Sequence, residues 1–502
     1  MEALHSGFSL LMSLDVLLAL SIGSIGGVII GAIPGVGPAV AIAILLPATF
    51  ALPPLTGLIM LLGIYGSSMF GGALPAILIN TPGTAVNALT TYDGFPMTKR
   101  GEAARALGLA YGASFFSGIL SVVALMLFAP LLAKIAPMFG AREIFLAALL
   151  GIILVIVAHR GHVAAAGMMA GLGILLQSVG MEPVKYTMRF TFGQGWLTSG
   201  VELIVVVLGL FAISQALTLL IAPENAPRTA PVTGNVGREM MGVWKYRRVA
   251  TAGSVFGVVM GIIPGVGEFT AQFMSYTFAR KRSATPETFG KGSAEGLVAS
   301  ESANNAVPAA AMIPLLALGI PGEALTAMML SVFYVHNVVP GPALFRDDLG
   351  FVYALFIALI ALNILVVGFM LAASNWIVRL TRIPTRFLGM MILTLSFVGV
   401  YSLRNSIVDC ALAAGFGVLG LILKRLHLPI VPIILGMVLG GIMEVKLRAA
   451  LARVESPLDF LNRPISALLV LSILWVVAAH ARPGLMDGMV NAIWTGLKRR
   501  SK

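Results

Sequence analysis

The chain has 502 residues, of which 58% are hydrophobic and 11% charged, and its formal net charge is +12. Soluble domains carry about 25% charged residues, so this chain has too few charges to cover a water-soluble surface. Its basic residues lie between apolar runs and at the C-terminus, as the positive-inside rule expects of a polytopic membrane protein, and this placement argues against binding of nucleic acid.

Sixteen apolar runs follow one another along the chain, separated into two groups by a polar connector. The first group lies at 14–33, 38–52, 57–79, 106–129, 144–158, 162–179 and 201–222. The second lies at 249–263, 266–279, 298–318, 322–340, 351–378, 388–403, 406–423, 428–445 and 464–481. Several runs are shorter than a full span, so we expect an all-α membrane protein with about 12–14 membrane segments, some of them broken helices or re-entrant hairpins.

The connector divides the chain into predicted units. We expect a first transmembrane repeat at 1–222, a cytoplasmic connector at 223–248 and a second transmembrane repeat at 249–445. A C-terminal segment at 446–502 carries the last membrane helix and a basic tail. If all seven runs of the first group cross the membrane, the two repeats are inverted; if 38–52 is re-entrant, they are parallel.

A fifteen-residue stretch at 23–37 recurs at 253–267, a shift of 230, with ten identical positions. Similarity at a fixed shift indicates a duplicated structural unit. Each copy begins as an apolar helix with glycines four residues apart, which allow a second backbone to approach closely in lipid. Each copy then reaches Pro-Gly-Val-Gly, which a helix interior does not accommodate without releasing backbone groups. In hydrocarbon these groups need protein, water or a solute as partners.

A second pair of interruptions follows at Pro82-Gly83 and Pro321-Gly322, at a shift of 239. Interrupted helices at matching positions of two halves point to the binding site of a transporter, and their N-termini suit a carboxylate without any lysine. The alternatives are kinked helices that only pack closely, and caps formed by Asn80 and Thr84. The predicted substrate-binding residues are Pro34, Gly35, Gly37, Asn80, Thr81, Pro82, Gly83, Thr84, Pro264, Gly265, Gly267, Pro321 and Gly322.

A polar patch at 295–305 precedes an apolar stretch. Glu301, Asn304 and Asn305 share one helical face by their spacing, and amide and carboxylate oxygens suit Na⁺. The alternative is an N-cap with an acid in the first helical turn. Glu268 and Glu323 each follow a Pro-Gly pair, and acids inside a membrane are functional candidates. We predict that these five residues couple transport to Na⁺ or H⁺, with no other cofactor.

Three further polar residues receive a different interpretation. Asp93, Glu102 and His336 are assigned to solvated loops or to contacts with lipid headgroups. They are therefore left out of the predicted site.

The motifs together resemble the large membrane subunit of the tripartite tricarboxylate transporters. The motifs that carry this resemblance lie at 31–38, 79–84, 93–96, 264–267, 289–292, 301–306, 318–322 and 340–342. The resemblance implies a permease of the bacterial inner membrane that imports carboxylates, driven by Na⁺ or H⁺. It also implies two partners, a small membrane subunit and a periplasmic solute-binding protein.

Other functions remain open on the residues alone. The chain could be a permease for a different small solute. An intramembrane enzyme would need a paired metal-binding acid motif, an H-E-x-x-H motif or a nucleophile beside its base. The sequence contains no H-E-x-x-H, and its histidines are scattered. A purely structural subunit is disfavoured because duplicated helix interruptions destabilise a fold and require compensation.

Overall fold

The computed structural model describes residues 2–33, 36–159, 161–182, 186–221, 232, 234–265, 267–380, 384–452 and 456–481. The helices of the first part are α1 (Glu2–Leu11), α2 (Leu14–Gly31), α3 (Gly37–Thr49), α4 (Pro54–Ile79), α5 (Ala88–Lys99), α6 (Ala103–Ile135), α7 (Ala141–Ala158), α8 (Val163–Gln177), α9 (Leu203–Val207) and α10 (Ser214–Ile221). Those of the second part are α11 (Val236–Met240), α12 (Arg247–Ile262), α13 (Gly267–Arg282), α14 (Ala294–Leu318), α15 (Ala324–Val335), α16 (Pro342–Asp347), α17 (Leu349–Leu380), α18 (Thr385–Arg404), α19 (Ile407–Arg425), α20 (Val431–Leu451) and α21 (Pro464–Ala481).

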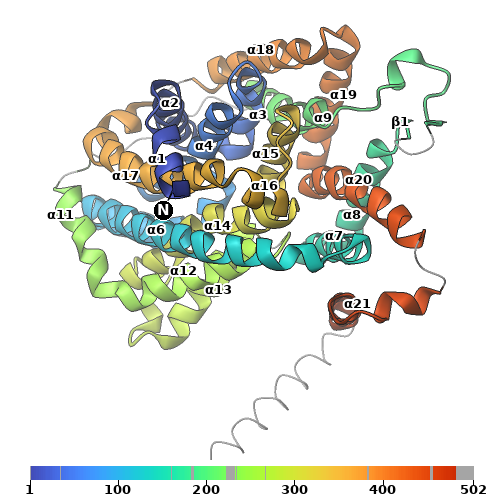
Figure 1. Cartoon of the computed structure of the whole chain (residues 1–502). Helices are drawn as coiled ribbons and strands as arrows, with labels where there is room; N and C mark the ends of the chain where they lie inside the picture. Colours follow the sequence, from blue (N-terminus) through green and yellow to red (C-terminus); the bar gives the residue numbers. More distant parts are fainter. Residues whose placement is uncertain are drawn as a thin grey trace, which may run out of the picture.

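Shorter elements join these helices (Figure 1). Two antiparallel strands, β1 (Gly180–Met181) and β2 (Met188–Arg189), pair between α8 and α9. A π-helical turn, η4 (Leu208–Ile213), connects α9 to α10. The 3₁₀ turns are η1 (Ala85–Asn87), η2 (Ala136–Met138), η3 (Gly195–Leu197), η5 (Met241–Tyr246), η6 (Pro286–Thr288) and η7 (Pro457–Leu461).

The predicted all-α membrane architecture is confirmed. Eight helical segments of the described chain are long and apolar enough to cross a membrane. Four shorter apolar helices accompany them at Gly37–Thr49, Val163–Gln177, Ala324–Val335 and Pro464–His480. Two of these short helices, α3 and α15, directly follow predicted interruptions, as expected for half-helices.

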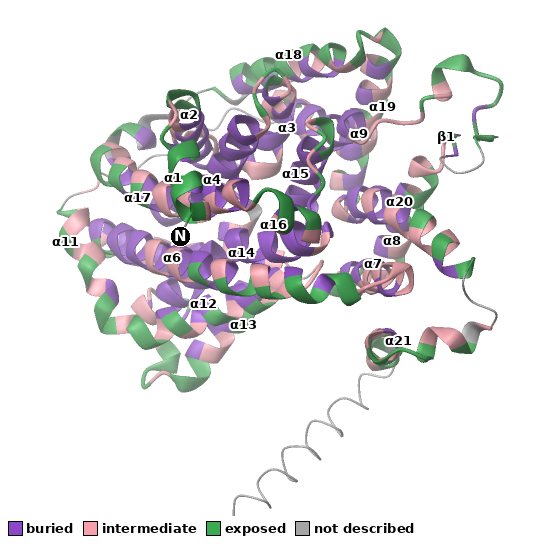
Figure 2. Cartoon of the chain, in the orientation of Figure 1, coloured by how far each residue is buried: buried purple, intermediate pink, exposed green. Residues whose placement is uncertain are grey.

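The protein buries its central helices and exposes apolar side chains on its outer helices. Figure 2 shows α4 and α14 buried at the centre of the bundle. On the outside, Leu127 of α6 is 64% exposed and Leu468 of α21 is 65% exposed. Large side chains of this kind on an outer surface are suited to lipid, which replaces water as their neighbour.

The two copies of the duplicated stretch pack in the same way. Helix α2 lies against α4, and α12 lies against α14. A Cβ atom at Gly27 would lie 2.1 Å from the Ser67 Oγ atom, and one at Gly257 would lie 2.4 Å from the Ala303 carbonyl oxygen. Only glycine permits these helix-to-helix approaches, as the four-residue spacing predicts. The opposite orientation of the two repeats in the membrane stays a prediction.

The two predicted repeats are interleaved rather than separate. Helix α6 from the first repeat packs along α14 from the second, and α17 contacts α4 and α6. Residues 223–231 and 233 of the predicted connector lie outside the described residues. The predicted unit boundaries stay predictions, but the central contacts are formed by both repeats together.

Candidate functional site

The first pair of predicted interruptions is present. Helix α2 ends at Gly31, and α3 begins at Gly37, whose φ is +68°. Helix α12 ends at Ile262, and α13 begins at Gly267. The φ angle is +82° at Gly265 and +65° at Gly267. These left-handed backbone conformations favour glycine, which explains its recurrence after each proline. Two predicted site residues, Pro34 and Gly35, lie outside the described residues.

The second pair of interruptions is also present, and each begins at a left-handed residue. Asn80 ends α4 with φ +56°, and Gly319 ends α14 with φ +69°. The Asn80 backbone amide donates to the Pro75 carbonyl oxygen, so Asn80 closes the C-terminus of α4 through its backbone rather than capping a helix start with its side chain. Pro75 and Pro314 lie inside helices, and the chain breaks only after them.

The two interruptions of each half touch each other. A Cβ atom at Gly83 would lie 2.0 Å from the Gly31 carbonyl oxygen. In the second half, the Gly265 amide donates to the Gly322 carbonyl oxygen at 2.6 Å. In the second half, a backbone group released by one broken helix thus finds its partner in the neighbouring interruption, as a low-dielectric environment requires. In the first half, the Gly83 amide donates instead to the Gly72 carbonyl oxygen of α4 at 3.2 Å.

All four interruptions reach one cavity. It has a volume of about 690 Å³, within the range of about 300–1,000 Å³ usual for small-molecule sites. The residues of the interruptions that line it are Val36, Gly37, Pro38, Pro82, Gly83, Thr84, Gly265, Gly267, Glu268, Glu323 and Ala324. The N-termini of three helices of twelve or more residues, α3, α13 and α15, therefore meet around one space. Their unpaired N–H groups and partial positive charges favour an anion there.

Two predicted ion-coupling acids lie in this cavity. Glu268 is in the first turn of α13, and its Oε1 atom is buried without a hydrogen-bond partner among the described residues. Glu323 is the N-cap of α15, and the Tyr65 hydroxyl donates to its carboxylate. Tyr65 belongs to α4, so this contact connects the two predicted repeats. A buried acid with a free oxygen is a candidate to bind a proton or a cation.

Glu301 lies in a separate, closed polar cluster and is fully buried. The Ser114 hydroxyl donates to its Oε2 atom at 3.1 Å, and the Asn305 amide group donates to the same oxygen at 3.4 Å. The Thr90 hydroxyl and the Asn87 amide group donate to Oε1. These four donors come from η1, α5, α6 and α14. The cluster satisfies the carboxylate with neutral donors and connects the predicted repeats.

Asn304 does not join this cluster through a hydrogen bond. It is fully buried, and neither its Oδ1 nor its Nδ2 atom has a partner among the described residues. Helix α14 begins at Ala294 after the capping residue Ser293, and Glu295 is the acid of its first turn, so the alternative of a capped helix start holds for the beginning of the patch. Glu301 lies further along the helix and is not a first-turn acid. A buried amide without partners costs free energy unless a solute or ion contacts it.

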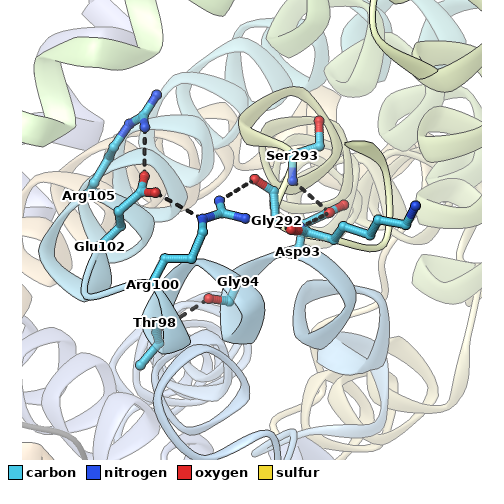
Figure 3. Close-up of polar contacts among 9 residues, drawn as sticks. Asp93, Gly94, Thr98, Arg100, Glu102, Arg105, Gly292 and Ser293 are labelled. Carbon is cyan, nitrogen blue, oxygen red and sulfur yellow. Dashed lines mark hydrogen bonds and ion pairs between the residues drawn. The ribbon is translucent and has the colours of Figure 1, made fainter. Parts of the chain in front are cut away.

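The assignment of Asp93 to a solvated loop was wrong. Asp93 is fully buried on α5, and its Oδ1 atom accepts hydrogen bonds from the backbone amides of Gly290, Gly292 and Ser293 at 2.7–2.9 Å (Figure 3). The Tyr276 hydroxyl donates to Oδ2 at 2.8 Å. Nearby, Arg100 donates to the carbonyl oxygens of residues 291 and 292. The motifs at 93–96 and 289–292 therefore contact each other in the folded chain. This contact cannot be predicted from the sequence around either motif alone.

Other predicted residues lie beside the cavity rather than on its lining. Asn80 and Thr81 are exposed, and the Thr81 hydroxyl donates to the Ile79 carbonyl. Pro264 lies close to Gly151 of α7, and Pro321 and Gly322 are buried. These residues shape the interruptions whose neighbours line the cavity.

Four polar residues of the cavity lining have no counterpart among the predicted site residues. They are His159, Gln215, Thr270 and Lys424. None of them belongs to a recognised motif, and only Lys424 offered a signal, because it is a charge at the end of an apolar run. The helix N-termini were expected to suit a carboxylate without the help of a lysine, and the cavity lining contains Lys424 in addition to them.

Comparisons with known proteins agree with this architecture. The model of the tripartite tricarboxylate transporter TctA family matches residues 17–435. An uncharacterised 52.8 kDa protein in the TAR-I ttuC' 3' region of Agrobacterium vitis is 35% identical over 468 residues, which cover 91% of this chain and 92% of the relative. An uncharacterised protein in the TAR-II ttuC' 3' region of the same organism is 33% identical over 226 residues, which cover 44% of this chain and 93% of the relative. No solved structure matches the chain significantly.

The family match includes all four interruptions, the cavity and the contact between the motifs at 93–96 and 289–292. The longer relative aligns along nearly its whole length. With eight helices in its described part able to cross a membrane, the chain is a multi-pass membrane protein and belongs to the tripartite tricarboxylate transporter TctA family.

Proposed function

We propose that this protein is the permease subunit that imports small organic anions, tricarboxylates, dicarboxylates or related carboxylates, across the bacterial inner membrane. The observation that carries the proposal is the single cavity lined by all four helix interruptions. Discontinuous helices at matching positions of two repeats form the substrate sites of many secondary transporters.

The shape and polarity of the cavity support an anionic substrate. The N-termini of α3, α13 and α15 offer backbone donors, and Thr84 and Thr270 add hydroxyl groups to the lining. Apolar residues such as Met69, Phe211 and Leu435 provide the rest of the wall. Few polar groups in a largely apolar cavity are typical of a site that fixes the orientation of a small ligand.

Two acids in the same cavity support coupling to a cation. Glu268 and Glu323 would repel a carboxylate unless they are protonated or bind a cation. Entry of H⁺ or Na⁺ together with the substrate removes this repulsion, so the substrate and the driving ion support each other's binding. Asn304 and Asn305 on α14 do not line this cavity, and Asn305 belongs to the Glu301 cluster. They are the proposed further ligands for the coupling ion, because the side-chain oxygens of both are buried without a partner among the described residues.

Membership of a tripartite family supports two partner proteins. We propose that a small membrane subunit completes the permease and that a periplasmic solute-binding protein delivers the substrate. The chain then supplies the translocation path.

Uptake by proteoliposomes that contain the three subunits tests this function. Labelled mono-, di- and tricarboxylates are offered with a Na⁺ gradient or a proton gradient imposed separately. We expect one class of carboxylate to accumulate only with one of the two gradients. Accumulation of none of them with either gradient would contradict the proposal, whereas conversion of a substrate in detergent, where no gradient exists, would indicate an enzyme.

A further inference from the structure

We infer that Lys424, held by Gln215, binds a second carboxylate of the substrate and selects molecules with two or more negative groups over monocarboxylates. This inference rests on the proposed function, because it names the class of substrate that the cavity accepts. Lys424 lies in the last turn of α19, in the C-terminal part of the chain that carries no recognisable motif.

The side chain of Lys424 is held at the cavity by a specific contact. Its Nζ atom donates a hydrogen bond to the Gln215 Oε1 atom at 2.8 Å, and both residues line the cavity. Gln215 lies on α10 and is only 9% exposed. This contact fixes a flexible ammonium group in place, and it leaves further N–H donors of the ammonium for a ligand.

Lys424 differs from Arg404 and Arg448, which also lie near helix ends, because its charge has no ion-pair partner among the described residues. Arg404 contacts the carboxylates of Glu202 and Asp409, and Arg448 contacts those of Glu182 and Glu444. Among the described residues, no carboxylate forms an ion pair with Lys424, and its hydrogen-bond acceptor is a neutral amide. A half-buried ammonium without a counter-charge favours an anion in the adjoining space.

Besides Lys424, the cavity contains a second place that can bind an anion, formed by the N-termini of α3, α13 and α15. Backbone N–H groups at helix starts bind one carboxylate well. A substrate that reaches from these helix starts to Lys424 needs two negative groups on a short skeleton. The volume of the cavity, about 690 Å³, is large enough for such a molecule. Lys424 thus distinguishes dicarboxylates and tricarboxylates from monocarboxylates.

A structural role offers a different explanation, because cations in the last turn of a helix stabilise its C-terminus. Arg425 is the matched control for this role. It is adjacent, carries the same positive charge, is exposed and is absent from the described lining of the cavity. Loss of its charge alters the helix end without altering the cavity.

The experiment measures uptake of a monocarboxylate, a dicarboxylate and a tricarboxylate by the complete transporter carrying Lys424→Gln, Lys424→Arg or Arg425→Gln. Membrane amounts and melting temperatures are recorded for each variant. For Lys424→Gln, we expect the KM of the multiply charged substrates to rise about tenfold to a hundredfold, because a charge-assisted hydrogen bond is lost. We expect the monocarboxylate KM to change about twofold or less, Lys424→Arg to retain the preference, and Arg425→Gln to behave as the unmodified protein.

The outcomes separate the inference from the proposed function. If the unmodified transporter imports carboxylates and Lys424→Gln keeps its preference, the inference is overturned and the proposed function stands. An equal loss for all three substrates also overturns it, because the residue then does not discriminate between them. If the unmodified transporter imports none of the three, both the proposed function and the inference fail.

Discussion

Glu301 and Glu268 are both buried acids of the second half, yet their surroundings differ. Glu301 accepts hydrogen bonds from four side chains and lies in a closed cluster between α5, α6 and α14. Glu268 lies on the cavity, and one of its oxygens has no partner among the described residues. The saturated carboxylate has little capacity left for a ligand, whereas the unsaturated one can accept a proton or a cation. Burial of an acid alone therefore does not distinguish a structural role from a functional one.

The largest expected effect follows from removal of the saturated carboxylate. Glu301→Ala leaves Ser114, Thr90, Asn87 and Asn305 without their common acceptor, so we expect a loss of about 3–5 kcal/mol in stability. The melting temperature and the yield of folded protein in detergent measure it. Glu301→Gln keeps one acceptor oxygen and should lose less. An unchanged melting temperature for Glu301→Ala would show that the cluster does not hold the two repeats together.

A smaller loss is expected where the interruptions touch. Gly83→Ala places a methyl group against the Gly31 carbonyl oxygen, and overpacking of this kind costs about 1–3 kcal/mol. The displaced backbone also lines the cavity, so we expect uptake to fall. The control is Gly26→Ala, because a Cβ atom at Gly26 meets nothing within 4 Å. Equal melting temperatures for the two variants would contradict the close contact.

Glu268→Gln changes the carboxylate that has an oxygen without a hydrogen-bond partner among the described residues. Because the Oε1 atom of Glu268 has no hydrogen-bond partner to lose, we expect a stability change within about 1 kcal/mol. Substrate accumulation should lose its dependence on the driving gradient, because a glutamine side chain neither takes up and releases a proton nor carries a charge. The two measurements are the melting temperature and gradient-driven uptake. A strong destabilisation with normal coupling would assign Glu268 to the structural class with Glu301.

The smallest effect on stability is expected for Asn304→Ala. This change removes two buried polar atoms without partners, and the relief of that cost offsets much of the lost packing, so the net change should stay within about 1 kcal/mol. Cation-dependent uptake should nevertheless be abolished, while insertion into the membrane stays intact. We expect the same loss of uptake for Asn305→Ala. Normal uptake with normal ion dependence in both variants would remove the ion-site assignment on α14.

Helices and their interruptions could be predicted from the sequence because they depend on residues that are close together along the chain. The apolar runs predicted the helices, since segments that cross lipid must satisfy their own backbone groups. The Pro-Gly pairs predicted the interruptions, because proline lacks an amide hydrogen and glycine adopts positive φ angles. The glycines at 23, 27 and 31, repeated at 253, 257 and 261, predicted two close helix contacts, and both are present.

The partners of individual side chains required the tertiary structure. Glu301 meets Thr90 across 211 positions of sequence, and Lys424 meets Gln215 across 209. Asp93 binds a loop about 200 residues away, which is why a motif beside basic residues was mistaken for a solvated loop. Local propensity and periodicity describe neighbours along the chain, whereas the saturation of a buried charge depends on which distant helices pack around it. The sequence by itself thus determined where the backbone opens inside the membrane, and only the packing of the helices decided which charged groups face the opening.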